Sequence, residues 1–347
     1  MKKHWTIIAV IFSVLVGLAI VAKVYQEIPL LSVINTFQHG SNMAILGFIG
    51  ASIGIVLLHT WRWHIIIKTA GIKVSFWKTI LYRIVGYGIS FITPIAKVGG
   101  EPIRAMLLQR EGATFSRGFS TVAIDRIIEL AITGVLFVVG ILIAIITLAL
   151  PTNLFIIMII LVVFVLSVLV WFYFRLISKK NIILSIFQFF RLHKIKKIRH
   201  WEENIVKMDT WMMEFSKNHK IEFNRIVLIT TAAWLLMFIE YKSVLMIFGV
   251  THISFAGLFL IITMMGFAYL VPIPLALGIL EAAQISVFAM LGLNVAAGVA
   301  LSIVIRARDF IWTLLAVGIL AIFGFNIRKA YKKSLEEGGV RLPKEII

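Results

Sequence analysis

The sequence predicts an all-α, polytopic membrane protein, on three grounds. Of its 347 residues, 61% are hydrophobic and only 14% are charged, whereas soluble domains usually carry about 25% charged residues. Several apolar runs approach or exceed the roughly 20 residues that a helix needs to cross a bilayer. Short segments of alternating polarity, typical of an outer-membrane barrel, are missing. We therefore expect a single transmembrane domain over residues 1–347, located in the cell membrane.

Apolar stretches in chain order give the expected elements. Full spans are expected at 5–25, 43–67, 117–150, 153–175, 223–248 and 296–325. Two further stretches, 77–93 and 256–271, end at proline-containing breaks, and a short helix is expected after each, near 102–111 and 279–291. Lys2 and Lys3 precede the first run, and because no clear small-residue cleavage site follows it, we expect a retained helix instead of a signal peptide.

The net charge of +18 favours membrane lipids as partners, with no nucleic acid. Lys and Arg gather on cytoplasmic segments that face anionic lipid, and residues 175–222 hold 11 of them against 5 Asp or Glu. This segment and the basic tail are therefore placed in the cytoplasm, as are both termini. The chain has no cysteine, which excludes disulfides and thiolate metal sites. Histidines do not cluster with carboxylates, so no metal and no cofactor is expected.

Charge asymmetry also predicts the topology. If 77–111 crossed the bilayer once, Arg104, Arg110 and Arg117 would lie partly outside, whereas a re-entrant hairpin keeps them cytoplasmic. About six full spans and two re-entrant broken-helix hairpins that enter from opposite faces satisfy the rule, and eight ordinary spans are the alternative. The expected parts are an N-terminal helix and outer loop (1–42), a first repeat (43–150), a connecting helix and basic segment (151–222), a second repeat (223–325) and a cytoplasmic tail (326–347).

The two halves resemble each other, as inverted-topology repeats would. "GIKVSF" at 71–76 recurs as "GVTHISF" at 249–255. An offset of 180 residues then places Pro94, Glu101, Gly112, Gly118, Arg126 and Glu129 on Pro274, Glu281, Gly292, Gly298, Arg306 and Asp309. Broken helices at corresponding positions of inverted halves are the best sequence pointer to a transport site.

Each hairpin carries helix-breaking residues followed by a glutamate. They are Pro94, Gly99, Gly100 and Pro102 in the first hairpin and Pro272, Pro274 and Gly278 in the second. Irregular backbone inside a membrane is tolerated where it is buried in protein or lines a wet cavity, and a helix N-terminus there attracts an anion. Glu101 and Glu281 are therefore candidate functional groups. The alternative for Glu101 is a capping role, paired with Arg104.

Charges inside the two long apolar helices form the second candidate set. They are Asp125, Arg126 and Glu129 in one helix and Arg306, Arg308 and Asp309 in the other. Each set lies roughly ten residues, or about 15 Å, from its helix start, where charges usually face a partner or a water-filled path. Arg126/Glu129 and Arg306/Asp309 are i,i+3 pairs that share a helix face. One interpretation is a closed structural ion pair that links each long helix to its hairpin, whereas the functional interpretation has an arginine holding a phosphate group. A further set contains His59, Arg62, His64, Arg83, Glu240 and Lys242. Most of these residues are interpreted as interfacial anchors, since Trp61 and Trp63 mark a boundary.

Four stretches resemble the lysylphosphatidylglycerol synthase transmembrane-region family of flippase-like membrane proteins. They are "KVGGEPIRAMLLQREG", "VAIDRIIEL", "GILEAAQISVFAMLGL" and "IRARDFIWTL". The resemblance covers roughly residues 5–330 and includes the flippase domain of multiple peptide resistance factors. It implies movement of a polar-headed lipid between leaflets, with Glu101, Arg104, Asp125, Arg126, Glu281 and Arg306 on motif positions. The chain ends soon after its last apolar run, so no aminoacyl-transferase domain and no lysyl-lipid synthesis is expected.

The leading functional hypothesis is therefore a flippase-like transporter of a phospholipid or polyprenyl-phosphate lipid, which is not an enzyme. Its expected substrate-binding residues are Glu101, Arg104, Asp125, Arg126, Glu129, Glu281, Arg306, Arg308 and Asp309. An integral membrane head-group transferase, with Glu101 or Asp125 as acid–base group, is the runner-up. A non-catalytic partner of a glycosyltransferase is the third hypothesis, and a homodimer stays open.

Overall fold

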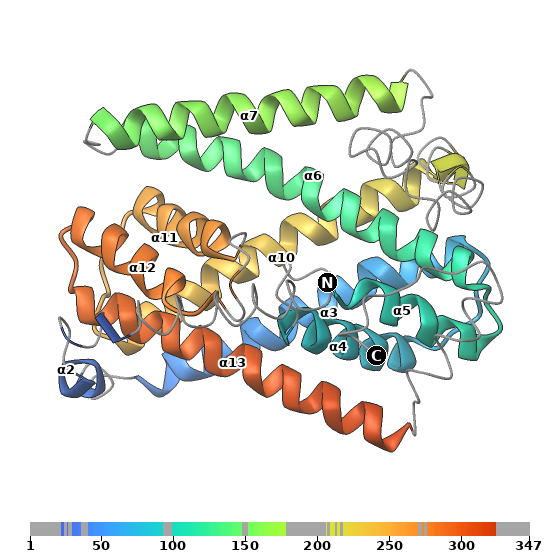
Figure 1. The fold of residues 1–347 in the computed structure, drawn as a ribbon, viewed down its shortest axis with the longest axis horizontal. Coiled ribbons are helices and arrows are strands. Elements are labelled where there is room, and N and C mark those ends of the chain that lie inside the picture. The colour runs from blue at the N-terminus through green and yellow to red at the C-terminus, as the bar shows by residue number, and fades with distance from the viewer. Residues whose placement is uncertain are drawn as a thin grey trace, which may run out of the picture.

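The computed structural model describes most of the apolar part of the chain. The described residues are 22–23, 26, 30–35, 41–92, 99–147, 152–177, 206, 209–211, 214–215, 218–269, 273 and 276–323. Almost all of the expected span 5–25, most of the basic segment 175–222 and the tail 326–347 lie outside them. The regular elements in the described part are helices (Figure 1): α2 (Leu30–Asn35), α3 (Asn42–Thr69), α4 (Phe76–Ile92), α5 (Glu101–Leu108), the 3₁₀ turn η2 (Gln109–Glu111), α6 (Phe115–Thr147), α7 (Thr152–Ile177), α10 (Lys220–Ile247), α11 (Phe255–Ala268), α12 (Ile279–Met290) and α13 (Val295–Ile322).

The expected all-α membrane class is confirmed by these helices. Three of them are long and apolar enough to cross a bilayer, over Asn42–Thr69, Phe115–Ile146 and Lys220–Ile247. A helix of 28 residues such as α3 is about 42 Å long at 1.5 Å per residue, which exceeds the hydrocarbon thickness of roughly 30 Å. α13 has the same length but carries three charges at its middle. The count of six spans stays a prediction.

Corresponding helices of the two halves begin in similar ways. The Ser75 side chain accepts a hydrogen bond from the Lys78 amide at 3.3 Å beside the start of α4, and Ser254 accepts one from the Gly257 amide at 3.1 Å at α11. Such side-chain oxygens satisfy the orphan donors at a helix start. The turns before α6 and α13 contain Gly112 at φ 83° and Gly292 at φ 66°, a conformation that favours glycine. These two turn glycines lie 180 positions apart, which is the offset found in the sequence.

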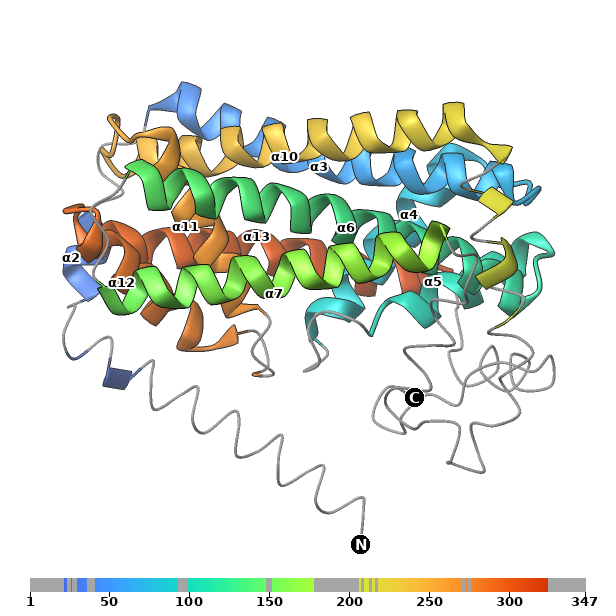
Figure 2. The same cartoon turned by 90° about the horizontal axis from the view of Figure 1, so that it is seen from above.

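The helix contacts can be compared with the repeat, which stays a prediction. α3 packs along α10, α4 packs along α13, and α11 packs against α6. In the predicted repeat, α4 corresponds to α11 and α6 corresponds to α13, so the α4–α13 contact and the α11–α6 contact are equivalent. The α4–α5 pair and the α11–α12 pair lie at opposite ends of the bundle in Figures 1 and 2. Entry of the two hairpins from opposite faces of the membrane stays a prediction.

Small residues let the short helices approach their neighbours. A Cβ on Gly100 would lie 1.8 Å from the Gly86 carbonyl oxygen, so α4 and the start of α5 meet backbone to backbone. A Cβ on Gly118 would meet the Ala105 carbonyl oxygen at 3.0 Å, and one on Gly298 would meet Phe288 at 2.9 Å. Each of these last two glycines seats a long helix against the second helix of its own hairpin. The close packing carries the charged residues of α5 and α6, and of α12 and α13, toward one another.

Candidate functional site

Two groups of ionic side chains lie inside the bundle. The first cluster contains Arg62, Arg83, Glu101, Arg104, Asp125, Arg126 and Glu129, and the second cluster contains Glu240, Glu281, Arg306, Arg308 and Asp309. All nine expected substrate-binding residues belong to one of the two clusters. The structure therefore joins residues that the sequence placed on separate helices.

Asp125 is the centre of the first cluster. Its side chain is fully buried, and it accepts hydrogen bonds from Arg62 Nε at 2.7 Å, Arg83 Nη1 at 2.7 Å and Arg104 Nη2 at 2.8 Å. The three arginines come from α3, α4 and α5, while Asp125 belongs to α6. Bonds between ionised partners are roughly twice as strong as neutral ones. One carboxylate thus ties the first hairpin to the two long helices beside it.

Arg62 is fully buried, so the interpretation of this residue as an interfacial anchor is wrong. Besides Asp125, its guanidinium contacts Glu129 Oε2 at 2.6 Å. The neighbouring Trp61 is exposed as an anchor would be, but Trp63 is buried and lies under the Arg104 guanidinium, with 3.8 Å from Cζ to the ring centroid. Consecutive residues of a helix face different directions. The sequence therefore contained a signal that Arg62 would not share the exposed, membrane-boundary position of Trp61.

Arg126 is the most exposed cation of the first cluster. Its side chain is 33% exposed, and its nitrogens lie 3.8 Å from Glu101 Oε1 and 3.5 Å from Glu129 Oε1. The expected pairing of Glu101 with Arg104 is not what the structure shows, because Arg104 is bound to Asp125 instead. Glu101 Oε2 is buried without a hydrogen-bond partner among the described residues.

The second cluster begins with a closed pair between Arg306 and Glu281. Two nitrogens of Arg306 contact the two oxygens of Glu281, with 3.0 Å between Nη2 and Oε2, and Nη2 also donates to the Ala276 carbonyl at 3.2 Å. This contact links the long helix α13 to the second hairpin, as the alternative of a structural ion pair between each long helix and its hairpin expected.

Arg308 joins the two remaining carboxylates of the second cluster. It donates to Glu240 Oε2 at 2.6 Å and to Asp309 Oδ1 at 2.7 Å. The hydroxyls of Tyr87 and Tyr269 donate to Asp309 at 2.6 and 3.0 Å. Ser52 donates to Glu240, which is nearly fully buried. Glu240 was also interpreted as an anchor, and its burial in this network makes that interpretation wrong.

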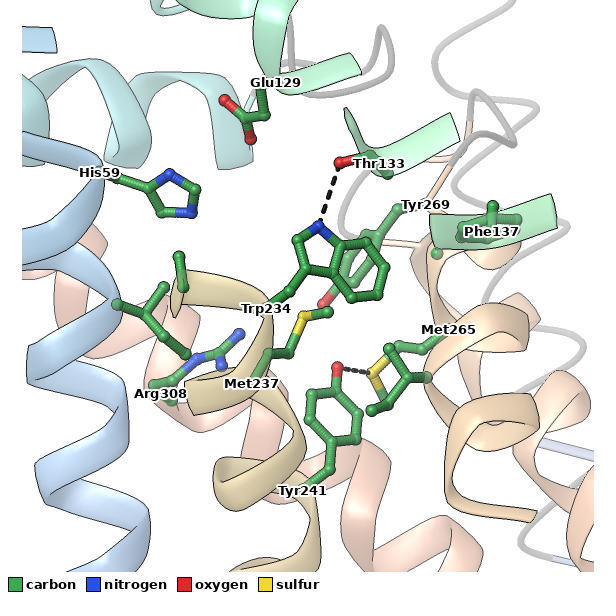
Figure 3. A pocket seen from close by; sticks show the side chains of 14 residues that line it. His59, Glu129, Thr133, Phe137, Trp234, Met237, Tyr241, Met265, Tyr269 and Arg308 are labelled. Carbon is green, nitrogen blue, oxygen red and sulfur yellow. Dashed lines mark hydrogen bonds between the residues drawn. The ribbon is translucent and has the colours of Figure 1, made fainter. Parts of the chain in front are cut away.

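A cavity of about 290 Å³ lies between the clusters (Figure 3). His59 and Glu129 line it on the side of the first cluster, and Arg308 lines it on the side of the second. Between them lies a largely apolar wall that contains Phe137, Trp234, Met237, Tyr241, Met265 and Tyr269. Since the walls come from α3, α6, α10, α11 and α13, both halves of the chain contribute to the chamber.

The charges of the two clusters balance as a whole but not separately. The first cluster has four arginines and three carboxylates, a surplus of +1, and the second has two arginines and three carboxylates, a surplus of −1. Charges taken out of water need partners, so the near-balance explains how these side chains are held inside apolar helices. At the cavity itself, the lining members are Glu129 of the first cluster and Arg308 of the second.

The helix-break residues fall in two groups. Gly99 and Gly100 form the turn before α5, Pro102 lies in its first turn, and Gly278 at φ 75° precedes α12. Proline is favoured there because its missing N–H is not needed in the first helical turn. Pro94, Pro272 and Pro274 lie outside the described residues. The two glutamates therefore begin or nearly begin the second helix of each hairpin, as the sequence predicted.

Comparisons of the sequence with known proteins identify a family and several relatives. The sequence model of the family described as the lysylphosphatidylglycerol synthase TM region matches residues 9–318. A UPF0104 membrane protein of Methanothermobacter thermautotrophicus is 24% identical over 79% of this chain and 83% of its own length. UPF0104 membrane proteins of Pyrococcus horikoshii and Methanocaldococcus jannaschii are 34% and 35% identical over 22% and 38% of this chain. These two matches span only 23% and 39% of the relatives' own lengths.

Proposed function

The chain belongs to the lysylphosphatidylglycerol synthase transmembrane-region family, and from this premise we propose that it moves a phosphate-bearing lipid between the leaflets of a membrane. The observation that carries the proposal is the cavity of about 290 Å³ between the two ionic clusters. A polar head group needs such a chamber, because crossing hydrocarbon without polar partners costs several kcal/mol for each buried polar group. The cavity is built from both halves, as sites at repeat interfaces of transporters are.

We assign the phosphate to Arg126, which does not line the cavity itself but contacts Glu129, which does. Guanidinium forks match phosphate geometry, and Arg126 is both the most exposed cation of the first cluster and loosely held by its neighbours. The surplus of +1 in this cluster attracts an anion. Arg83 and Arg104 support the positive charge but are bound to Asp125. Tilting of one half against the other would then expose the head group to alternate sides.

Transport fits the contacts better than head-group transfer does. Both oxygens of Asp125 already accept bonds from guanidiniums, so the carboxylate could take a proton only by giving up a strong partner. Glu101 is the other acid–base candidate. Its nearest charged neighbour among the described residues is Arg126, at 3.8 Å, and a cation at this distance favours the ionised carboxylate over the protonated acid. Lipid mass spectrometry of cells that overexpress the protein separates the two functions, since a transferase produces a new covalent lipid species and a transporter does not.

Reconstitution tests the proposal directly. The purified full chain is placed in liposomes with labelled phospholipids or polyprenyl phosphates, and leaflet exchange is followed against empty liposomes. We expect faster exchange for at least one phosphate-bearing lipid and a loss of about tenfold or more in Arg126→Ala, since tenfold corresponds to about 1.4 kcal/mol of lost interaction. Arg225→Ala, at an exposed position near the start of α10, is the matched control and should not change the rate. Exchange no faster than in empty liposomes over a broad lipid panel contradicts the proposal.

A further inference from the structure

Each half has a glutamate–arginine pair at an equivalent position. Glu101 begins α5 and faces Arg126 of α6, and Glu281 lies in the first turn of α12 and faces Arg306 of α13. Both residues of the second pair lie 180 positions after those of the first. Each pair therefore joins the second helix of a hairpin to the long helix that follows it.

The first pair is open. Arg126 and Glu101 are 3.8 Å apart at their nearest atoms, beyond the range of about 2.7–3.2 Å for an N–H···O hydrogen bond. The side chains are 33% and 13% exposed. Glu101 Oε2 is buried and has no hydrogen-bond partner within the described part of the chain. The geometry is that of two charges that attract each other without contact.

The second pair is closed. Arg306 holds both oxygens of Glu281 and also binds the Ala276 carbonyl. Its side chain is 18% exposed and that of Glu281 is 2% exposed. The partners are chemically the same as in the first half, so the residue types do not explain why one pair is open and the other is closed.

Inverted repeats explain the difference. In such proteins the two halves exchange conformations when access changes from one side to the other, so equivalent contacts differ within any one state. We propose that Glu101–Arg126 and Glu281–Arg306 are alternating gates, and that the structure shows the first gate open and the second gate closed. Closing the first gate accompanies opening of the second. The gates rest on the proposed function, because they supply its change of access.

Contacts across the halves provide the coupling. Tyr87 of α4 donates to Asp309 of α13 at 2.6 Å, and a Cβ on Gly88 of α4 would already meet the Ala316 Cβ at 2.5 Å. A movement of the first hairpin therefore moves α13, which carries Arg306 of the second gate. Energetic coupling between sites is carried by such packed contacts and rigid elements.

Thiol labelling tests the gates without a transport assay, because the chain has no cysteine of its own. Pro102→Cys and Ala282→Cys introduce single thiols at equivalent, half-buried positions next to the gate glutamates. The full-length variants are placed in nanodiscs, where a membrane-impermeant maleimide reaches both faces. We expect Pro102→Cys to react several-fold faster than Ala282→Cys.

A second substitution then shifts the balance between the gates. Glu281→Gln weakens the closed gate, so labelling of Ala282→Cys should rise several-fold while labelling of Pro102→Cys falls. Arg306→Lys keeps the charge but loses the fork, and it should shift both rates in the same directions by less, even where Glu281→Gln does not fold. Glu222→Gln, a partly exposed residue at the start of α10, should change neither rate.

The outcomes separate the gates from the proposed function. A rise at Ala282→Cys without a fall at Pro102→Cys, or no change at either position, overturns the alternating gates. Reciprocal labelling in a protein that exchanges no lipid in liposomes keeps the gates and removes the transport proposal. Lipid exchange without reciprocal labelling keeps transport and removes the gates.

Discussion

Several equivalent positions of the two proposed halves differ in charge, and one of them is occupied by Arg62 in the first half and by Glu240 in the second. Arg62 and Glu240 each stand 20 residues after the first residue of their helices, Asn42 of α3 and Lys220 of α10. Arg62 binds two carboxylates, whereas Glu240 binds Arg308 and Ser52. The first cluster thus has a surplus of +1 and the second cluster a surplus of −1. Substitutions at equivalent positions of the two proposed halves thus account for the different net charges of the two clusters.

Neutralising one carboxylate in each half should break this comparison most strongly. Asp125→Asn leaves three arginines without their shared anion and raises the first surplus from +1 to +2, so we expect the free energy of unfolding to fall by about 3–5 kcal/mol. Glu240→Gln takes the second surplus from −1 to 0 and leaves Arg308 its bonds to Asp309, so the expected loss is smaller than for Asp125→Asn. Thermal unfolding of the purified proteins in one detergent measures both. Equal losses would show that the charge surplus does not govern stability.

A methyl group at the start of α5 tests the packing of the first hairpin. Gly100→Ala puts a Cβ where the Gly86 carbonyl oxygen lies, and such overpacking typically costs about 1–3 kcal/mol. The equivalent position of the second hairpin, 180 residues later, is the buried Leu280, so the two hairpins meet their neighbours differently. Gly50→Ala, where no atom lies within 4 Å of a Cβ, is the control in the same unfolding assay. Equal stability of the two variants would contradict the backbone-to-backbone contact.

Aromatic residues at matching positions should give the smallest effects. Trp63→Phe removes a hydrogen bond to Thr121 at 3.2 Å and weakens the stack under Arg104, which together are worth about 1–2 kcal/mol. Tyr241, which lies 178 positions later, lines the cavity and donates to Met265 Sδ. Because that bond is a weak one, Tyr241→Phe should cost less than about 1 kcal/mol. The unfolding midpoints measure both losses of stability. A larger loss in Tyr241→Phe than in Trp63→Phe would contradict the expectation that Trp63 makes the stronger contacts.

Local pattern predicted the helices and the candidate residues but not their partners. Long apolar runs ended at charges, glycines and prolines, so the expected boundaries lie within a few residues of those observed. The i,i+3 spacing offered Arg104 as a partner for Glu101, yet Arg104 binds Asp125. An ion pair between each long helix and its hairpin was one of the alternatives, and the structure identifies Glu281 as the hairpin partner of Arg306. Contacts between helices decided the pairing, and these depend on packing that local spacing does not encode. Arg62 and Glu240 were missed for the same reason, since each lies in a helix whose neighbours in sequence pointed to the membrane boundary.

The crossed packing of α4 on α13 and of α11 on α6 has a consequence for biogenesis. When the ribosome has finished the first half, α4 has reached the membrane but its permanent neighbour has not yet been synthesised. Neither half can bury its own interface alone, so a fragment containing one repeat should be recognised by quality-control proteases. Two co-expressed fragments, obtained by splitting the chain between α7 and α10, should protect each other from degradation. The full chain should become resistant to these proteases only after α13 has been synthesised.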